Sequence, residues 1–265
     1  MAQTYENKLY IGTILLERNR WAAERQPSYA VSDWQRRFQE DGFDGIELWE
    51  NHAILADERE RSVLEASGFV TIINSYIGFE DGDAAEKKRE EAAALMNRLR
   101  APAVKFNLGA DPAQLPVYIA NVKRWAELLP ADCRILCECH PGTVAEHPDA
   151  AAEMLRRLGD GPFQAIVHPF CCLEELEDWF KRLGSAITHA HVQLRDEDNH
   201  FIRLSQRPEL VKDRLALMRR MGFRGSFTLE FTEGVHLNEE VREALYEAAL
   251  EDLQILRNIW NGNPS

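Results

Sequence analysis

The amino-acid sequence predicts an α/β fold, a single-domain (β/α)8 TIM barrel spanning residues 1–265. Eight short apolar runs alternate with longer segments of helical periodicity, and eight strand–helix pairs over about 250 residues match the size of such a barrel. No linker rich in Pro, Gly or Ser and no repeat divides the chain. An open, doubly wound sheet is the rival fold, but neither G-x-G-x-x-G nor G-x-x-x-x-G-K-S/T occurs to support it.

The strands are expected where apolar runs lie between turn-forming residues. In chain order they occupy residues 9–15, 44–49, 69–74, 102–108, 134–139, 164–168, 187–194 and 226–231. Caps mark several helices between them. Ser32 and Gln35 fit a capping box, Asp111 precedes Pro112 at a helix start, and the last helix opens at Asn238. Left-handed helix ends are expected at Gly42, Gly68 and Gly222.

The composition is that of an ordinary globular chain, with 45% hydrophobic and 28% charged residues. A formal net charge of -13 argues against nucleic acid and against an anionic membrane surface as partners. No signal peptide and no run of ~18 apolar residues is found. Five cysteines, an odd number, indicate reduced thiols and a cytoplasmic protein.

Polar side chains fall on one face of six of the eight predicted strands. In "ITHAHVQLRD", His189, His191, Gln193 and Arg195 alternate with an apolar set. The same parity gathers Glu47, Trp49, Lys105, Asn107, Glu138, His140, His168 and Glu230 opposite the helix-packing residues. Burying carboxylates and imidazoles singly costs several kcal/mol each, unless they are paired or bind metal. One polar pocket at the carboxyl ends of the strands is the simplest reading. The alternative is a set of separately satisfied buried residues, and a strand boundary shifted by one residue would reverse the parity.

The motifs "FDGIELW", "LCECHPGT", "VHPF", "HAHVQLRD" and "FTLEF" resemble the xylose isomerase-like barrels in order and spacing, from Tyr10 to Trp260. That group includes sugar isomerases and epimerases, inosose and 3-dehydroshikimate dehydratases, and endonuclease IV. The resemblance implies one divalent ion, Mn²⁺, Co²⁺, Zn²⁺ or Mg²⁺, held by Glu138, His168, Gln193 and Glu230. With a shifted register, His191 would be the ligand and Gln193 a substrate contact.

Three positions of this implied site distinguish the chain within the group. Gln193 resembles the dehydratase branch more than the epimerases, which usually carry histidine there. His168 stands where an Asp is usual. Cys171 takes the place of a second histidine that commonly follows that Asp.

The resemblance also implies a mechanism, in which a proton moves next to a carbonyl through an enediolate. Glu138 and Glu230 would divide this role from opposite sides of the sugar, or both would only hold the metal. Glu47 and His191 are expected to contact substrate. His140 would bind a substrate oxygen or hydrogen-bond to Glu138.

Two cations and three aromatic residues are further candidates for substrate contact. Lys105 would bind an anionic group or pair with Glu47 or Glu138. Arg195 would clamp an anion or pair with Asp196 or Glu197. Trp49, His52 and Tyr76 offer aromatic faces to a sugar, and loops 16–29 and 75–86 are expected to set specificity. His147, His200 and His236 receive no role.

The leading hypothesis is a metal-dependent isomerase or epimerase acting on a small carbohydrate-like molecule. A lyase of the dehydratase kind is the second hypothesis, and a catalytically inactive barrel that serves as a binding module is the third. A homo-oligomer stays open. Endonuclease activity is disfavoured by the net acidity. The cysteines read as buried thiols, because Cys137, Cys139, Cys171 and Cys172 lack the C-x-x-C spacing of a zinc site.

Overall fold

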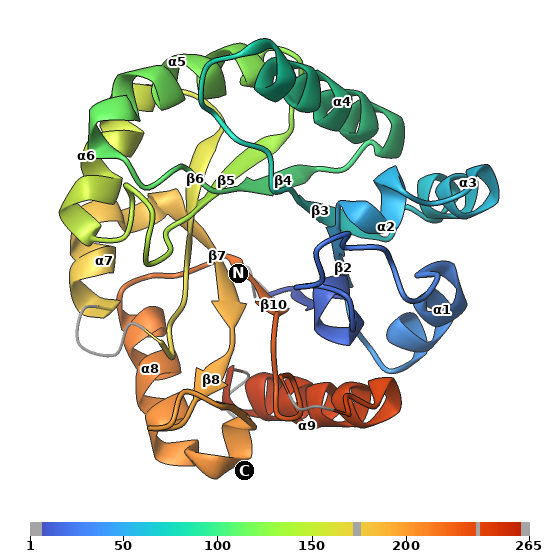
Figure 1. Cartoon of the computed structure of the whole chain (residues 1–265). Coiled ribbons are helices and arrows are strands. Elements are labelled where there is room, and N and C mark those ends of the chain that lie inside the picture. The colour runs from blue at the N-terminus through green and yellow to red at the C-terminus, as the bar shows by residue number, and fades with distance from the viewer. Residues whose placement is uncertain (1–6, 172–175, 237–238, 261–265) are drawn as a thin grey trace, which may run out of the picture.

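The computed structural model describes residues 7–171, 176–236 and 239–260, and in it eight parallel strands close into a barrel ringed by helices (Figure 1). The order around the barrel is β1-β10-β7-β6-β5-β4-β3-β2. Because β1 pairs with both β2 and β10, the sheet has no free edge and the predicted TIM barrel is confirmed over the open sheet. The barrel strands are β1 (Leu9–Gly12), β2 (Gly45–Trp49), β3 (Val70–Asn74), β4 (Ala103–Phe106), β5 (Arg134–Glu138), β6 (Phe163–Val167), β7 (Ile187–Val192) and β10 (Ser226–Leu229).

Helices follow the strands and cover the outside of the barrel. They are α1 (Ser32–Glu40), α2 (Asn51–Ile54), α3 (Glu58–Ser67), α4 (Asp83–Leu99), α5 (Leu115–Ala126), α6 (Pro148–Leu158), α7 (Leu176–Leu183), α8 (Pro208–Arg220) and α9 (Arg242–Trp260). Short 3-10 turns lie at Thr13–Leu16, Pro112–Gln114, Gly184–Ala186 and Leu204–Gln206. None of the helices in the described part of the chain has the length and apolar character needed to cross a bilayer.

The predicted element ends were right in part. Asp111 caps its turn by accepting a hydrogen bond from Ala113 N at 2.9 Å, but that turn is a 3-10 turn running into α5. The capping box was wrong: Ser32 lies inside α1, and its backbone N–H donates to Glu60 of α3 at 2.9 Å. Asn238 lies outside the described residues. Left-handed φ angles of 98°, 60° and 82° confirm the helix ends at Gly42, Gly68 and Gly222.

Several predicted strands end early, two of them with a different local structure. Residues 13–15, assigned to the first strand, belong to a 3-10 turn (Thr13–Leu16) after β1. Residues after Val192 leave the barrel, so that β8 (Leu194–Arg195) pairs antiparallel with β9 (Phe201–Ile202). Arg195 therefore belongs to a hairpin above the barrel rather than to the barrel wall.

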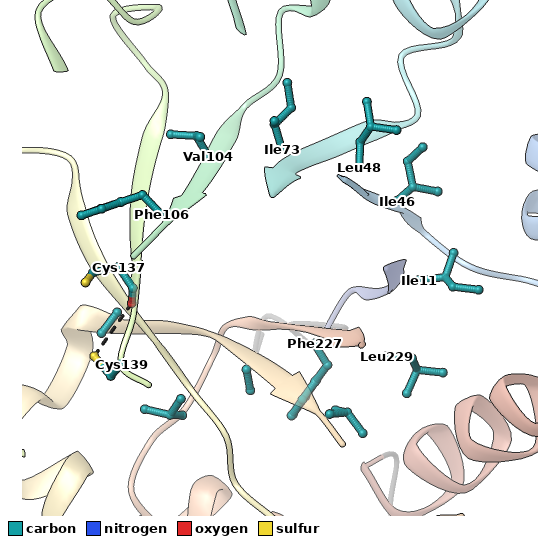
Figure 2. Close-up of a cluster of buried hydrophobic side chains, with 14 of the residues drawn as sticks. Ile11, Ile46, Leu48, Ile73, Val104, Phe106, Cys137, Cys139, Phe227 and Leu229 are labelled. Atoms are coloured by element: carbon teal, nitrogen blue, oxygen red, sulfur yellow. Dashed lines mark hydrogen bonds between the residues drawn. The ribbon is translucent and has the colours of Figure 1, made fainter. Parts of the chain in front are cut away.

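The side-chain alternation along the strands separates two buried layers. One set faces the helices and includes Ile46, Leu48, Val104, Phe106, Cys137, Cys139, Phe227 and Leu229 (Figure 2). A second apolar cluster fills the barrel interior and consists of Tyr10, Ile72, Ala103, Leu136 and Ile166. Ala103, Leu136 and Ile166 each lie two residues before a polar side chain of the predicted pocket, so the polar groups form the next layer toward the strand ends.

A buried carboxylate holds α9 to the loops beside the barrel mouth. Asp252 accepts hydrogen bonds from Leu204 N at 2.8 Å and from Thr232 Oγ1 at 2.7 Å. Burial, partly offset by these two bonds, raises the pKa of Asp252 to about 7. The carboxyl therefore ionises at higher pH in the folded chain than in the unfolded one.

This raised pKa predicts a pH-dependent stability. Between pH 3.8 and about pH 7 the folded chain keeps a proton on Asp252 that the unfolded chain releases, so the free energy of unfolding falls as the pH rises. Asp252→Asn, which can keep both hydrogen bonds, should remove this contribution. Urea unfolding at both ends of this pH range checks the prediction. The free energy of unfolding of wild type, relative to that of Asp252→Asn, should be lower at pH 7 than at pH 4. A pH-independent difference between the two would contradict the prediction.

Candidate functional site

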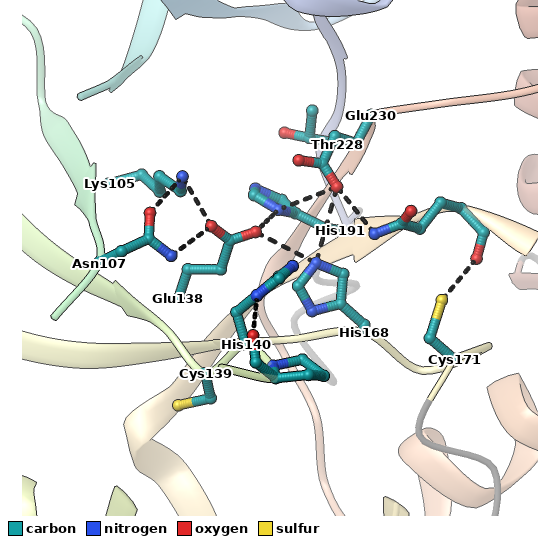
Figure 3. Close-up of polar contacts among 12 residues, drawn as sticks. Lys105, Asn107, Glu138, Cys139, His140, His168, Cys171, His191, Thr228 and Glu230 are labelled. Carbon is teal, nitrogen blue, oxygen red and sulfur yellow. Dashed lines mark hydrogen bonds and ion pairs between the residues drawn. The ribbon is translucent and has the colours of Figure 1, made fainter. Parts of the chain in front are cut away.

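Four ionisable side chains from four strands meet at the carboxyl ends of the barrel (Figure 3). Glu138 ends β5, His168 follows β6, His191 lies in β7 and Glu230 follows β10. One ligand atom from each lies within 4.8 Å of the others, and all four residues are buried. This cluster, called the floor cluster below, can hold a metal ion. The structure thus brings together Glu138, His168 and Glu230 of the predicted set with His191, the alternative ligand.

Glu138 is held as an ionised carboxylate. Its Oε2 atom lies 2.6 Å from Lys105 Nζ and accepts a hydrogen bond from Asn107 Nδ2 at 2.8 Å. Its Oε1 atom lies 3.0 Å from His191 Nδ1. Burial opposes the charge, but Lys105 and the two neighbouring histidines keep the pKa of Glu138 well below its usual range. Lys105 thus makes the ion pair with Glu138 that the sequence left open.

His191 links the floor cluster to a second carboxylate deeper in the barrel. Its Nε2 atom lies 3.1 Å from Glu47 Oε2. Burial disfavours the imidazolium, yet the carboxylates around it raise the pKa of His191 well above its usual value. Glu47 sits beneath the cavity floor and does not line the cavity, so as a predicted substrate contact it was wrong: its carboxylate neutralises a histidine instead.

His189 lies two residues before His191 on the same face of β7, and both of its ring nitrogens have hydrogen-bond partners inside the barrel. Its ring nitrogens contact Ser226 Oγ at 2.8 Å and Thr228 Oγ1 at 2.9 Å. Burial lowers the pKa of His189 to about 4, so this imidazole is neutral. Glu47, His189 and His191 also lie close enough to hold an ion. The ring nitrogens of both histidines already have hydrogen-bond partners, whereas Glu47 Oε1 has none among the described residues.

Two polar atoms at the floor cluster are buried without a hydrogen-bond partner among the described residues. The Nε2 atom of His168 lies 3.2 Å from Glu138 Oε1 and 3.6 Å from Glu230 Oε2, but it is not aligned to donate to either. Gln193 donates from Nε2 to Glu230 Oε2 at 3.1 Å, which leaves its carbonyl oxygen Oε1 unpaired. An imidazole nitrogen and an amide oxygen left unpaired beside two carboxylates suit a divalent cation.

The floor cluster opens into a cavity of about 700 Å³. Glu138, Gln193 and Glu230 reach it from the barrel, and the walls include Arg20, Trp21, Arg25, Tyr76, Asn107, His140, Arg195 and His236. Residues 16–29 and 75–86 both contribute, so the two loops expected to face a substrate do line the cavity. A cavity of this size fits a monosaccharide-sized ligand.

Three of the predicted substrate contacts line the cavity: His140, Tyr76 and Arg195. His140 lies on the cavity wall, where its Nδ1 atom contacts Pro141 O at 2.5 Å rather than Glu138. Tyr76 also lines the cavity. Arg195 lines it too; its Nη1 atom donates to Asn199 O at 3.0 Å, and its guanidinium lies 3.9 Å from the Phe201 ring centre.

Trp49 and His52 were wrong as faces for a sugar. Trp49 is fully buried and does not line the cavity, because Arg25 covers its ring at 5.1 Å. His52 is enclosed between Thr13 Oγ1 at 2.9 Å and Glu17 Oε2 at 3.0 Å. Both rings support the loop after β1 rather than a ligand.

Three cavity residues were missed from the sequence. Trp21 stacks on His236 with ring centres 3.7 Å apart, although His236 had been given no role. Beside them Arg20 forms an ion pair with Glu240 at 2.8 Å, which ties the loop after β1 to the segment before α9. Arg25 is the third. These residues lie in segments without periodicity, so only the presence of arginine and aromatic residues in a long loop after a strand could have pointed to them.

Four of the five cysteines lie in the described residues, and three of them are buried. Cys137 and Cys139 are buried and face the helices (Figure 2). Cys171 is exposed, and its Sγ atom lies 3.5 Å from Gln193 O, close to the floor cluster (Figure 3). Cys172 lies outside the described residues.

Comparison with solved structures finds proteins of similar fold. No family model matches the chain, and no curated protein matches it. The probable 3-DHS dehydratase AsbF involved in petrobactin synthesis from Bacillus anthracis has 18% identity and a TM-score of 0.72, covering 95% of this chain and 99% of that one. The IOLI protein, solved with a bound zinc atom, has 12% identity and a TM-score of 0.70, covering 97% and 99%.

A xylose isomerase domain protein from Planctomyces limnophilus has 12% identity and a TM-score of 0.62, covering 84% of this chain and 92% of that one. At such identities the likeness is one of fold, and it agrees with the strand order and the closed barrel described above. The chain has the fold of the xylose isomerase-like TIM barrels.

Proposed function

We propose that this chain is a divalent-metal-dependent isomerase or epimerase, which moves a proton next to the carbonyl of a sugar or sugar derivative. One observation carries the proposal: two glutamates and a histidine from three strands converge with an unpaired glutamine oxygen at the floor of a cavity of about 700 Å³. In a (β/α)8 barrel this end of the strands is where active sites lie.

Glu138, His168, Glu230 and the Oε1 atom of Gln193 would hold the ion. His191 is the less suitable ligand, because Glu47 and Glu138 already engage its two ring nitrogens. Two carboxylates, an imidazole and an amide oxygen suit Mn²⁺, Co²⁺, Zn²⁺ or Mg²⁺. When bound, such an ion supplies a Lewis acid that stabilises negative charge on a substrate oxygen.

Glu138 and Glu230 differ in their freedom to take a proton. Both oxygens of Glu138 are occupied, by Lys105 and Asn107 on one side and His191 on the other, so Glu138 is a weak base. Among the described residues Glu230 accepts one hydrogen bond, from Gln193 at Oε2, and the same oxygen lies 3.5 Å from His191 Nδ1 and 3.6 Å from His168 Nε2. Glu230 also lines the cavity. Glu230 therefore takes the proton. Glu138 stays ionised and keeps the side chains around it in position. The Nε2 atom of His140 is available for a substrate hydroxyl.

A dehydratase is the second candidate. Elimination of water begins with the same proton removal, and the hydroxyl on the next carbon then leaves with the electron pair. The observation in its favour is Gln193, which lies beside Glu230 with an unpaired amide oxygen, at a position where the epimerases usually carry histidine. The likeness in fold to a probable 3-DHS dehydratase is consistent with it.

Incubation with divalent metal and two kinds of substrate separates the two reactions. An isomerase or epimerase converts a member of a ketose panel into a new sugar peak, whereas a dehydratase converts 3-dehydroshikimate into protocatechuate, which absorbs ultraviolet light. Turnover should stop on treatment with a chelator and return with added metal. Chelator-resistant turnover would contradict the metal-dependent mechanism.

An inactive barrel that only binds a ligand is the third candidate, and metal analysis tests it. Protein purified without chelator should contain one transition-metal ion per chain if the floor cluster is a metal site. A metal-free protein whose melting temperature does not rise with Mn²⁺, Co²⁺ or Zn²⁺ would favour the inactive barrel. The departures at His168 and Cys171 make this measurement the first to perform.

A further inference from the structure

Arg25 places an unneutralised cation in the cavity. It lies in the loop between β1 and α1 and lines the cavity with the floor-cluster glutamates. Its guanidinium makes no ion pair and no hydrogen bond with any residue in the described ranges, and its Nε atom is buried without an acceptor. Arg25 as a whole is only partly buried, and its guanidinium carries five N–H donors that can serve a ligand in the cavity.

The other arginines of the cavity wall have partners within the chain: Arg20 pairs with Glu240 at 2.8 Å, and Arg195 makes no ion pair with the described residues but donates to the carbonyl of Asn199 at 3.0 Å. Lys105 is buried outside the cavity lining and pairs with Glu138 at 2.6 Å. Glu50 is the carboxylate whose charge is felt at Arg25, but Ser75 Oγ at 2.7 Å and Tyr76 N at 3.0 Å use its two oxygens. The guanidinium of Arg25 can therefore donate hydrogen bonds to a ligand in the cavity.

The surroundings of Arg25 fix its guanidinium in place. Its Cζ atom lies 5.1 Å from the Trp49 ring centre and 4.4 Å from that of Tyr76, so two aromatic faces support the planar cation. The backbone of Arg25 has a φ of 47°, a left-handed conformation that is uncommon outside glycine. Asn51 Nδ2 donates to Arg25 O at 2.9 Å and holds that conformation. Strain of this kind concentrates at functional positions.

The distance from Arg25 to the floor cluster is that of a small molecule. Arg25 Cζ and Lys105 Nζ each lie 4.4 Å from the centre of the Tyr76 ring, so the two are at most twice that distance apart, and Lys105 pairs with Glu138 at 2.6 Å. A ligand that reaches from the guanidinium to Glu138 therefore need be no larger than a monosaccharide or a substituted cyclohexane ring.

We infer that the substrate carries an anionic group, a carboxylate or a phosphate, which Arg25 binds while the carbonyl end lies at the floor cluster. This inference rests on the proposed function for its second half, but the anion site stands on the geometry of Arg25 alone. A guanidinium suits either group, since its N–H donors can form two parallel hydrogen bonds with the oxygens of a carboxylate or a phosphate.

Binding of matched ligands by isothermal titration calorimetry, with Mn²⁺ present, tests the inference. Shikimate and D-fructose 6-phosphate are the anionic probes, and myo-inositol and D-fructose are their neutral counterparts. Wild type should bind at least one anionic probe about 10- to 100-fold more tightly than its counterpart, as expected for hydrogen bonds to a charged group. The probe that shows this preference identifies the anion as carboxylate or phosphate.

Variants assign the preference to Arg25. Arg25→Gln should abolish it, Arg25→Lys should retain part of it, and Arg18→Gln, an exposed arginine of the same loop, should leave it intact. Circular dichroism and melting temperature show that each variant is folded. Equal affinity of wild type for anionic and neutral probes, no binding of either anionic probe, or an unchanged preference in Arg25→Gln would overturn the inference.

Metal content and turnover, measured on the same preparations, distinguish this failure from failure of the proposed function. A metal-loaded protein that turns over a neutral ketose equally well with and without Arg25 keeps the proposed function and loses the anion site. A protein that binds the anion through Arg25 but holds no metal keeps the anion site and loses the proposed reaction.

Discussion

Replacing Glu230 with Gln is expected to lower kcat by about 10²- to 10⁴-fold while the barrel stays folded. The amide keeps the size of the side chain and its contact with Gln193 but cannot take a proton from substrate. Glu138→Gln should abolish turnover as well, through weakened metal binding, because a neutral amide replaces the carboxylate whose Oε2 faces Lys105 and whose Oε1 faces the histidines. Since Glu230 also belongs to the proposed ligand set, steady-state kinetics at saturating metal, with metal analysis of each variant, separate loss of the base from loss of the ion.

The matched control for these variants is Glu80→Gln. Glu80 lines the same cavity but is exposed and lies outside the floor cluster. Activity of Glu80→Gln should stay within a few-fold of wild type. Near-wild-type turnover in either Glu138→Gln or Glu230→Gln would end the proposed mechanism.

Replacing Lys105 with Met should lower the free energy of unfolding of the metal-free protein by about 3–5 kcal/mol. The variant leaves Glu138 as a buried carboxylate that has lost the cation at 2.6 Å. Burial alone would lower the pKa of Lys105, and it is the carboxylate of Glu138 that raises it instead, so the two charges stabilise each other. Urea unfolding of chelator-treated protein measures the loss.

A double variant shows whether the loss comes from the unpaired charge. Lys105→Met combined with Glu138→Gln should be more stable than Lys105→Met alone, since the amide removes the uncompensated charge. Lys181→Met, which breaks an exposed pair with Glu177 on α7, should change stability little. A double variant no more stable than the single one would mean that packing, not charge, explains the effect of Lys105.

The barrel and most of the floor cluster could be predicted because both depend on periodicity. Alternation along strands has a period of two, so the parity that placed Glu138 and His168 inward depended only on where each strand ran. Parallel strands in a closed barrel all end at one mouth, so inward residues near those ends had to meet. The positions of Glu230 and Gln193 follow from the same rule.

The sequence could not predict which of the inward-facing and loop side chains contact one another. The sequence shows that Glu47 and His191 face inward, but their pairing depends on the stagger between strands, which places Glu47 one layer below the cavity. The loop after β1 has no period at all, so the stacking of Arg25 on Trp49 had no signal. The capping box failed at Ser32 because a tertiary contact with Glu60 replaced the local one.

The ion pair between Arg20 and Glu240 joins positions 220 residues apart. It lies beside the seam where β1 meets β10, so the mouth of the cavity forms only after residue 240 has left the ribosome. Until then a growing chain has an open sheet with unpaired edges, which invites association with other chains. Long-range closure of this kind makes slow folding the expected behaviour, and chaperones that shield nascent sheets should increase the yield of active protein.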